Sequence, residues 1–372
     1  MPKPILLAVV SDIWTSDLIE SVLLEAATYF DIHLFLLGET SPLFRGRLSQ
    51  SGIKILNIRV IGRSRTFIIM SYQIISFCYK RKPMMIYASG VLSTYSSILA
   101  LMIYRKAYSI YTRHHTNSHW NVRRLHWKYL DKLTFLVFKR VIAVSGVVRS
   151  ALLKEGCDDR KIRVIWNGIR LSQFIKIRKS RSTRNASQVI KVGIVSRLEK
   201  YKGVVYTLDA ILQLNVSKLS NNVKFHVMFA GNDTSTSDQE LKRHLALADE
   251  ARIIQFLPWQ VDMTSFYEEI DLLVHVPVDE TSEAFGMVYI EALATGVPSI
   301  FTISGVLTDF PELREFATII LPKDTTDIKK ALLTTSASRL ENKSPALIPE
   351  EYLKRFDLKS VSRTYLDTFI NK

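Results

Sequence analysis

Short apolar runs alternate with longer helical patterns along most of this 372-residue chain, and the alternation occurs twice. Short buried strands separated by amphipathic helices are typical of parallel sheets with crossover helices. Residues 176–187 are polar and basic, and they indicate an interdomain linker between the two series. The sequence therefore predicts an α/β protein with two Rossmann-like domains, residues 1–175 and 188–356, facing each other across a cleft. We expect a final helix, in residues 357–372, to pack back on the first domain.

The predicted strands are short and rich in aliphatic residues. The first series comprises Ile5–Val10, Ile32–Leu37, Ile53–Val60, Met84–Ala88, Ser109–Thr112, Arg140–Val144 and Arg163–Ile165. The second comprises Val189–Val195, Lys224–Ala230, Arg252–Phe256, Ile270–Val276, Pro298–Phe301 and Thr318–Leu321. Residues 83–104 lack charge and are long enough to cross a bilayer, but their serines and one glycine favour a strand followed by a helix. The two cysteines form no disulfide framework, which is the pattern of a reduced cytosolic protein.

The net charge of +15 belongs entirely to the first half of the chain. Residues 1–170 contain 25 Lys and Arg against 10 Asp and Glu, whereas residues 171–372 contain 25 of each. Such asymmetry indicates an anionic partner for the first half alone, which could be a membrane leaflet, a phosphorylated acceptor or nucleic acid. A merely soluble basic surface is the other interpretation.

Two stretches of the first half mix aromatic residues with cations. Residues 63–82 have an apolar middle with cations at both ends, and residues 120–132 place Trp and Tyr among Arg and Lys at helical spacing. Such helices can lie in a membrane interface or can be core helices with basic flanks. We expect an interfacial, acceptor-side role for the second stretch, through Arg123, Arg124, Trp127, Lys128 and Lys132.

Two glutamates in the second half form the most specific motif. Glu283 and Glu291 lie eight positions apart, with Phe285-Gly286 after the first and Gly296-Val-Pro298 after the second. The Phe-Gly pair places Glu283 in a loop before a helix that contains Glu291. Paired acids near a helix N-terminus suit hydroxyl groups together with an anionic tail, and a sugar nucleotide has both. A buried amphipathic helix with two solvated acids is the alternative.

A second motif follows the first strand of the second series. Gly193-Ile-Val-Ser-Arg197-Leu-Glu-Lys-Tyr-Lys202-Gly203 places Arg and Lys five positions apart on a turn closed by glycine. Arg can clamp a diphosphate through two nitrogens while Lys contributes a compact charge. Basic residues on a turn are often only solvated, but here the glutamate pair follows at the same sheet edge.

These motifs resemble those of the retaining glycosyltransferases of family 4, which have the two-domain GT-B architecture. The resemblance covers residues 141–305 and also includes Lys161-Ile-Arg-Val-Ile-Trp-Asn-Gly168. It implies that Arg197 and Lys202 bind the donor pyrophosphate and that Glu291 binds the ribose. Glu283 would bind the transferred sugar near the backbone N–H groups of Phe285 and Gly286, and Gly193 would belong to the donor site. The family needs no metal, and the sequence has no Asp-x-Asp triplet to hold one.

In the first half, the resemblance implies a donor-facing histidine within Tyr111-Thr-Arg113-His114-His115. His114 fits this place better than His115 if the strand geometry continues, and a pair of surface histidines is the alternative. The loop Ser11–Asp17 lacks the glycines that the family commonly has there, which puts its usual acceptor contact in doubt.

The sequence thus predicts a metal-independent retaining hexosyltransferase that needs no cofactor beyond a nucleotide-diphosphate sugar as co-substrate. We expect a glycan or lipid-linked acceptor, a role in surface polysaccharide assembly and peripheral attachment to the inner face of the cell membrane. A non-enzymatic polyanion or nucleic-acid binder is the main alternative, but we find no nucleic-acid motif and do not expect that partner. Another GT-B enzyme, such as a phosphorylase or an epimerase, is a nearer alternative.

Overall fold

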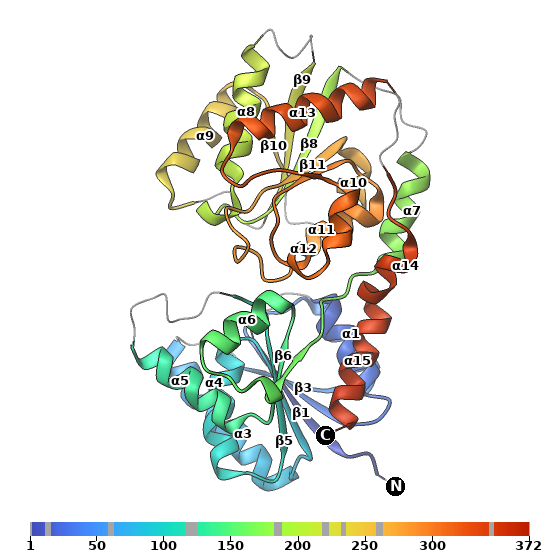
Figure 1. The fold of residues 1–372 in the computed structure, drawn as a ribbon. Coiled ribbons are helices and arrows are strands. Elements are labelled where there is room, and N and C mark those ends of the chain that lie inside the picture. The colour runs from blue at the N-terminus through green and yellow to red at the C-terminus, as the bar shows by residue number, and fades with distance from the viewer. Residues whose placement is uncertain are drawn as a thin grey trace. The chain divides into compact units, whose positions relative to one another are not determined.

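The computed structural model divides into two compact units, Met1–Ile169 with Phe356–Lys372 (unit 1) and Arg170–Arg355 (unit 2). The structure describes residues 2–11, 16–58, 63–116, 125–181, 188–217, 223–231, 236–257, 263–341 and 346–371. Each unit is built on a parallel sheet with crossover helices, so the α/β class predicted from the sequence is confirmed (Figure 1).

Unit 1 contains a seven-stranded sheet in the order β3-β2-β1-β4-β5-β6-β7. Its strands are β1 (Ile5–Ser11), β2 (Asp31–Leu37), β3 (Lys54–Ile58), β4 (Met85–Ser89), β5 (Tyr108–Arg113), β6 (Arg140–Ala143) and β7 (Ile162–Val164). Its helices are α1 (Asp17–Ala26), α2 (Pro42–Gln50), α3 (Arg63–Arg81), α4 (Val91–Ile103), α5 (Leu125–Val137), α6 (Gly146–Lys154) and the C-terminal α15 (Leu358–Ile370).

The C-terminal helix α15 completes the core of unit 1. Val361, Tyr365 and Phe369 are buried in the same cluster as the aliphatic residues of β1, β2 and α1. Figure 1 shows α1 and α15 on one face of the sheet and α3, α4 and α5 on the other. A Cβ added at Gly168 would lie 2.9 Å from Cα of Leu358, so a glycine permits the close approach where α15 begins.

Unit 2 contains a six-stranded sheet in the order β10-β9-β8-β11-β12-β13. Its strands are β8 (Val189–Val195), β9 (Lys224–Ala230), β10 (Ile254–Leu257), β11 (Leu272–His275), β12 (Ser299–Phe301) and β13 (Thr318–Ile319). Its helices are α7 (Leu171–Arg181), α8 (Val204–Val216), α9 (Gln239–Glu250), α10 (Thr264–Glu269), α11 (Met287–Thr295), α12 (Val306–Asp309), α13 (Thr325–Leu340) and α14 (Glu350–Leu353).

The predicted linker at residues 176–187 is wrong over its described part, because residues 176–181 belong to α7. The guanidinium of Arg178 donates to the carbonyl oxygens of Ala294 and Leu293, the last turn of α11, at 2.7 and 3.0 Å. Arg181 donates to the carbonyl oxygen of Tyr267 at 2.6 Å. These cations thus satisfy carbonyl groups that a helix end leaves without intrahelical partners.

The uncharged stretch at residues 83–104 forms β4 and α4, as predicted. Among the helices of the described residues, none combines the length and the hydrophobicity needed to cross a bilayer.

In each sheet, successive strands of the chain are added toward one edge and later toward the other edge. We call the pair of neighbouring parallel strands where this order changes the reversal point. β1 and β4 are neighbours in unit 1, and β8 and β11 are neighbours in unit 2, although each pair is separated by two further strands along the chain. Loops at the carboxyl ends of such strand pairs diverge and leave a crevice in which α/β proteins bind ligands. In unit 2, Arg197 and Lys202 follow β8 and Glu283 follows β11, so these candidate residues lie at such a position.

Candidate functional site

The loop after β8 carries the two cations predicted to bind a diphosphate. It contains the 3-10 helix η3 (Lys200–Lys202) and ends at Gly203, whose φ is +71°. A Cβ at Gly203 would lie 1.9 Å from the carbonyl oxygen of Val276, so this position requires glycine. The Val278 N–H donates to the carbonyl oxygen of Tyr201 at 3.0 Å. The loop is therefore fastened to the segment that follows β11.

This fastening brings Lys202 to Glu283. The Lys202 ammonium donates to Glu283 Oε1 and also to the carbonyl oxygen of Ser282, at 3.3 Å. His275, the last residue of β11, contacts the same carboxylate, with 3.0 Å between its Nε2 and Oε1. Lys202 and His275 are both buried. Lys202 and Glu283, 81 positions apart along the chain, thus belong to one compact charged group.

The Glu283 carboxylate is ionised at neutral pH. Burial raises its pKa, but the hydrogen bond and charge of His275, together with the charge of Lys202, outweigh this effect and lower the pKa to about 2. Among the described residues, Lys202 and His275 both engage Oε1 of Glu283. The carboxylate can accept further hydrogen bonds, and sugar hydroxyl groups are suitable donors.

Arg197 and Lys202 both lie close to the Tyr201 ring. The Arg197 guanidinium donates to the Tyr201 hydroxyl, and its Cζ is 5.8 Å from the ring centroid. The Lys202 Nζ is 5.2 Å from the same centroid. Arg197 is exposed while Lys202 is buried, so the two predicted cations converge, one at the surface and one beneath it. A guanidinium has five N–H donors, and an anionic ligand can use those that remain.

The two glutamates lie where the sequence placed them, with Glu283 in the loop before α11 and Glu291 within this helix. Gly286 begins α11 with a φ of +78°, and a Cβ there would lie 2.5 Å from the Tyr289 ring. Phe285 is buried. Glu291 is 8% exposed and accepts a hydrogen bond from the Tyr267 hydroxyl at 2.9 Å.

Gly193 lies within β8 and serves packing in this structure. A Cβ at this position would lie 2.5 Å from Cδ1 of Ile270 and 3.0 Å from Cζ of Phe266. The glycine therefore lets α10 and the residue after it approach the sheet closely.

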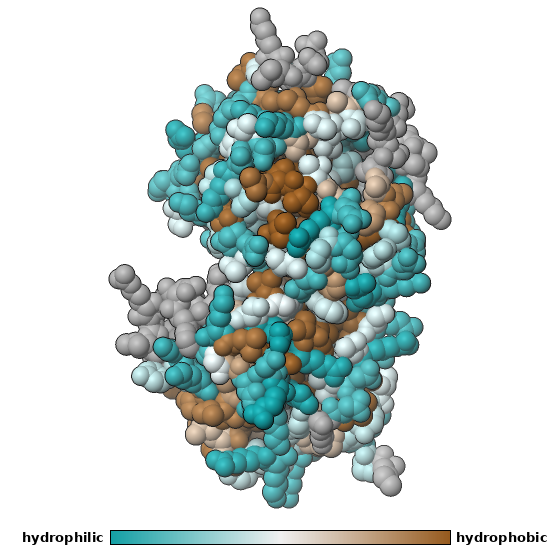
Figure 2. All heavy atoms as spheres, in the orientation of Figure 1, coloured by the Kyte–Doolittle hydropathy of each residue, from teal (hydrophilic) through white to brown (hydrophobic). Residues whose placement is uncertain are grey.

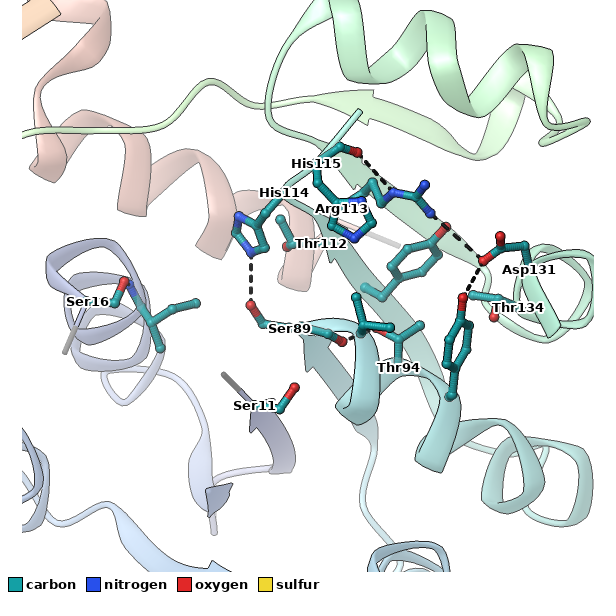
Figure 3. A pocket seen from close by; sticks show the side chains of 15 residues that line it. Ser11, Ser16, Ser89, Thr94, Thr112, Arg113, His114, His115, Asp131 and Thr134 are labelled. Carbon is teal, nitrogen blue, oxygen red and sulfur yellow. Dashed lines mark hydrogen bonds and ion pairs between the residues drawn. The ribbon is translucent and has the colours of Figure 1, made fainter. Parts of the chain in front are cut away.

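A pocket of about 350 Å³ opens at the reversal point of the unit 1 sheet. Its lining includes Ser11 at the end of β1, Ser89 at the end of β4 with Gly90 after it, and His114 and His115 after β5 (Figure 3). His114 Nε2 lies 3.0 Å from the Ser89 hydroxyl, and burial lowers the pKa of His114 to about 4. The imidazole is therefore neutral at pH 7 and can exchange hydrogen bonds with a neutral polar ligand. His115 lines the same pocket, so the choice between the two histidines stays a prediction.

A buried ionic network forms part of the lining of this pocket. The Arg113 guanidinium donates to the His115 carbonyl oxygen at 3.1 Å and to Glu155 Oε1 at 3.1 Å. Asp131 Oδ1 lies 3.9 Å from Arg113 and accepts a hydrogen bond from Tyr95 at 2.7 Å. The network fixes the backbone beside His114, as Figure 3 shows.

Several members of these groups were not predicted. His275 is the strongest example, because a polar side chain within a buried strand needs a partner, and this signal was present in residues 270–276. Asp131 and Glu155 carried no local signal, because they meet Arg113 only in the folded chain.

Other predicted residues have no described side chain. Arg123 and Arg124 lie outside the described residues, as does most of the glycine-free loop, residues 12–15. Trp127 is within α5. Of the predicted residues on this helix, Lys128 and Lys132 have described side chains, and Lys132 is exposed.

Comparisons with known proteins cover both units. A family described as Glycosyltransferase Family 4 matches residues 26–173, and one described as Glycosyl transferases group 1 matches residues 190–337. A curated relative, the D-inositol 3-phosphate glycosyltransferase of Corynebacterium urealyticum, is 28% identical over 181 residues. The match spans 45% of this chain and 41% of that relative's length.

Solved structures resemble the whole chain. Anabaena HepE in complex with UDP and glucose has a TM-score of 0.76 at 18% identity, with 100% of both chains covered. A glycosyltransferase from Rickettsia africae has a TM-score of 0.73 at 20% identity, with 99% of this chain and 98% of that chain covered. At these identities the likeness establishes the fold.

Proposed function

Because the chain belongs to the group 1 and family 4 glycosyltransferases and has their GT-B fold, we propose that it transfers a sugar from a nucleotide-diphosphate donor with retention of the anomeric configuration. The observation that carries this proposal is the cluster of Arg197, Lys202 and Glu283 at the reversal point of the unit 2 sheet. It combines cations for a diphosphate with a carboxylate for hydroxyl groups. The Anabaena neighbour, solved with UDP and glucose, supports a donor of this class.

Each residue of the cluster has a distinct role in this proposal. Arg197 and Lys202 bind the pyrophosphate, whose negative charge grows as the bond to the sugar breaks, so they stabilise the departing nucleoside diphosphate. Glu283 orients the transferred sugar through its hydroxyl groups, and His275 positions Glu283. Glu291 accepts hydrogen bonds from the ribose.

The retaining outcome is proposed from family membership. No side chain of the cluster is an evident nucleophile, because Glu283 Oε1 is engaged by Lys202 and His275. We infer that the acceptor attacks the face from which the diphosphate departs, with the leaving phosphate as its base. His114, neutral in the unit 1 pocket, is proposed to contact the donor sugar.

The acceptor is proposed to be a glycan or a lipid-linked sugar in surface polysaccharide synthesis. The excess of cations in residues 1–170 supports an anionic or membrane-bound acceptor on the side of unit 1. We propose that the protein acts in the cytoplasm, at the inner face of the cell membrane.

Binding of nucleoside diphosphates tests the donor assignment. We expect UDP or GDP to raise the Tm of the protein, by an amount that increases with ligand concentration relative to Kd. The matching monophosphate should have a much smaller effect, because it lacks the second phosphate that Arg197 and Lys202 would bind. Equal shifts from diphosphate, monophosphate and nucleoside would contradict the assignment. NMR of the product formed from the preferred donor then separates retaining transfer from inversion, phosphorolysis and epimerisation.

Metal independence is a separate prediction. Arg197 and Lys202 supply positive charge where other enzymes hold a divalent ion on the diphosphate, and the sequence has no Asp-x-Asp triplet. We expect EDTA to leave the initial rate of donor turnover unchanged. Complete loss of turnover that Mg²⁺ or Mn²⁺ restores would show that a metal ion takes part.

A further inference from the structure

Three neighbouring helices of unit 1 present no acidic side chain to solvent. Residues 40–130 contain 15 Lys and Arg but no Asp or Glu. Asp131 is the only acid within α3, α4 and α5, and it is 2% exposed and bound to Tyr95. The described charges at the surface of these helices are therefore all positive.

The same helices expose large apolar side chains. Ile68 and Tyr72 on α3 are 65% and 71% exposed, and Leu136 on α5 is 74% exposed. Further exposed residues on these helices are Ile69, Tyr79, Leu99, Met102, Ile103 and Tyr129. Because α3 packs on α4 and α4 on α5, these side chains belong to one face of unit 1, which we call the α3–α5 surface. Figure 2 shows hydrophobic residues gathered at the lower left of the molecule, where Figure 1 places α4 and α5.

Cations are interleaved with these apolar residues. Tyr129, Lys132 and Leu136 follow one another at helical spacing on α5, and all three are exposed. Other exposed cations lie at or just after the C-terminal ends of the helices: Lys80, Arg81, Lys82, Arg105, Lys106 and Lys139. Exposed apolar side chains combined with cations are typical of surfaces that enter the headgroup region of a bilayer.

We propose that the α3–α5 surface docks unit 1 onto an anionic lipid bilayer. The cations attract the headgroups, and the apolar side chains enter the boundary with the acyl chains. A soluble polyanion such as RNA would use the cations but would leave the apolar residues in water. The docking would hold the enzyme where a lipid-linked acceptor is embedded, so its biological role rests on the proposed function, whereas the docking itself rests on the surface alone.

Sedimentation with vesicles tests the proposal on the full-length protein. We expect binding to vesicles of phosphatidylcholine mixed with phosphatidylglycerol, weaker binding as salt rises, and none to phosphatidylcholine alone. The triple variant Lys80→Gln, Lys106→Gln and Lys132→Gln should lose on the order of 100-fold in affinity, since each cation near an anionic surface contributes about a factor of 5. The triple variant Ile68→Gln, Tyr72→Gln and Leu136→Gln should lose at least about 10-fold.

The matched control removes three exposed cations of unit 2, through Lys242→Gln, Arg243→Gln and Lys323→Gln, and should bind vesicles as the wild type does. Donor hydrolysis should be unchanged in all three variants, which distinguishes a failed docking surface from a failed enzyme assignment. Equal binding by the wild type and the two α3–α5 variants would overturn the proposal. So would a wild type that binds RNA but ignores the anionic vesicles, because the charge would then serve a nucleic acid.

Discussion

Replacement of Lys202 or Arg197 by alanine is expected to lower kcat by roughly 10²–10³ while the protein remains folded. Each substitution removes a cation from a diphosphate whose charge increases as the glycosidic bond breaks. Lys202→Ala should have the larger effect, because Lys202 also holds Glu283 and is buried, whereas Arg197 is exposed. Steady-state turnover of the preferred donor, with Tm as a check on folding, measures the effect.

Lys200→Ala provides the matched control. Lys200 lies in the same 3-10 helix as Lys202, but its side chain is exposed and it has no role in the proposed site. This variant should retain wild-type turnover. If it were as impaired as Lys202→Ala, the loss would reflect the general charge or conformation of the loop. Near-normal turnover in both Arg197→Ala and Lys202→Ala would refute the pyrophosphate assignment.

The architecture could be predicted because local patterns carry it. Every predicted strand is present, since short apolar runs bounded by turns reflect burial in a parallel sheet. The motif around Glu283 also placed the start of α11 correctly, because Gly286 adopts a left-handed φ that few other residues tolerate.

The features that could not be predicted from the sequence depend on contacts between residues that are distant along the chain. Residues 176–181 look like a solvated linker by composition, yet Arg178 binds carbonyl groups more than 100 residues away, and this contact favours a helix there. The same holds for Arg113, which meets Glu155 only after β5 and α6 have been brought together. The sequence shows which side chains are charged, but it does not show which distant groups form hydrogen bonds or ion pairs with them.

His275 stands between these two cases. Its position at the end of a buried strand was visible in the sequence, but its partner was not. The structure shows that His275 and Lys202 both contact Oε1 of Glu283. The imidazole and the ammonium group together fix this carboxylate oxygen. The sequence motif assigns Glu283 to the sugar, but it does not include His275, the residue that orients the Glu283 carboxylate.

The two glutamates are expected to differ in what their loss affects. Glu283→Gln should lower turnover strongly while leaving the affinity for free nucleoside diphosphate nearly unchanged, because the proposed partner of Glu283 is the sugar. Glu291→Gln should weaken binding of the nucleoside diphosphate itself, by about 1.5–3 kcal/mol for a lost hydrogen bond to a charged group, since its proposed partner is the ribose. Glutamine preserves the size of each side chain, so packing around Tyr267 and His275 is retained.

Calorimetry with the free nucleoside diphosphate, alongside turnover of the sugar donor, separates the two roles. The pKa of Glu283, lowered to about 2, adds a pH test with a defined sign. A carboxyl whose folded pKa is depressed stays ionised as pH falls toward that value, so protonation of Glu283 should not reduce activity between pH 7 and pH 4. An acid limb in that range must come from another group, and it should therefore persist in the residual activity of Glu283→Gln. If the limb vanished in this variant, Glu283 itself would titrate in that range and its lowered pKa would be contradicted. If both variants lost equal affinity for the diphosphate, the proposed division between sugar and ribose would be wrong.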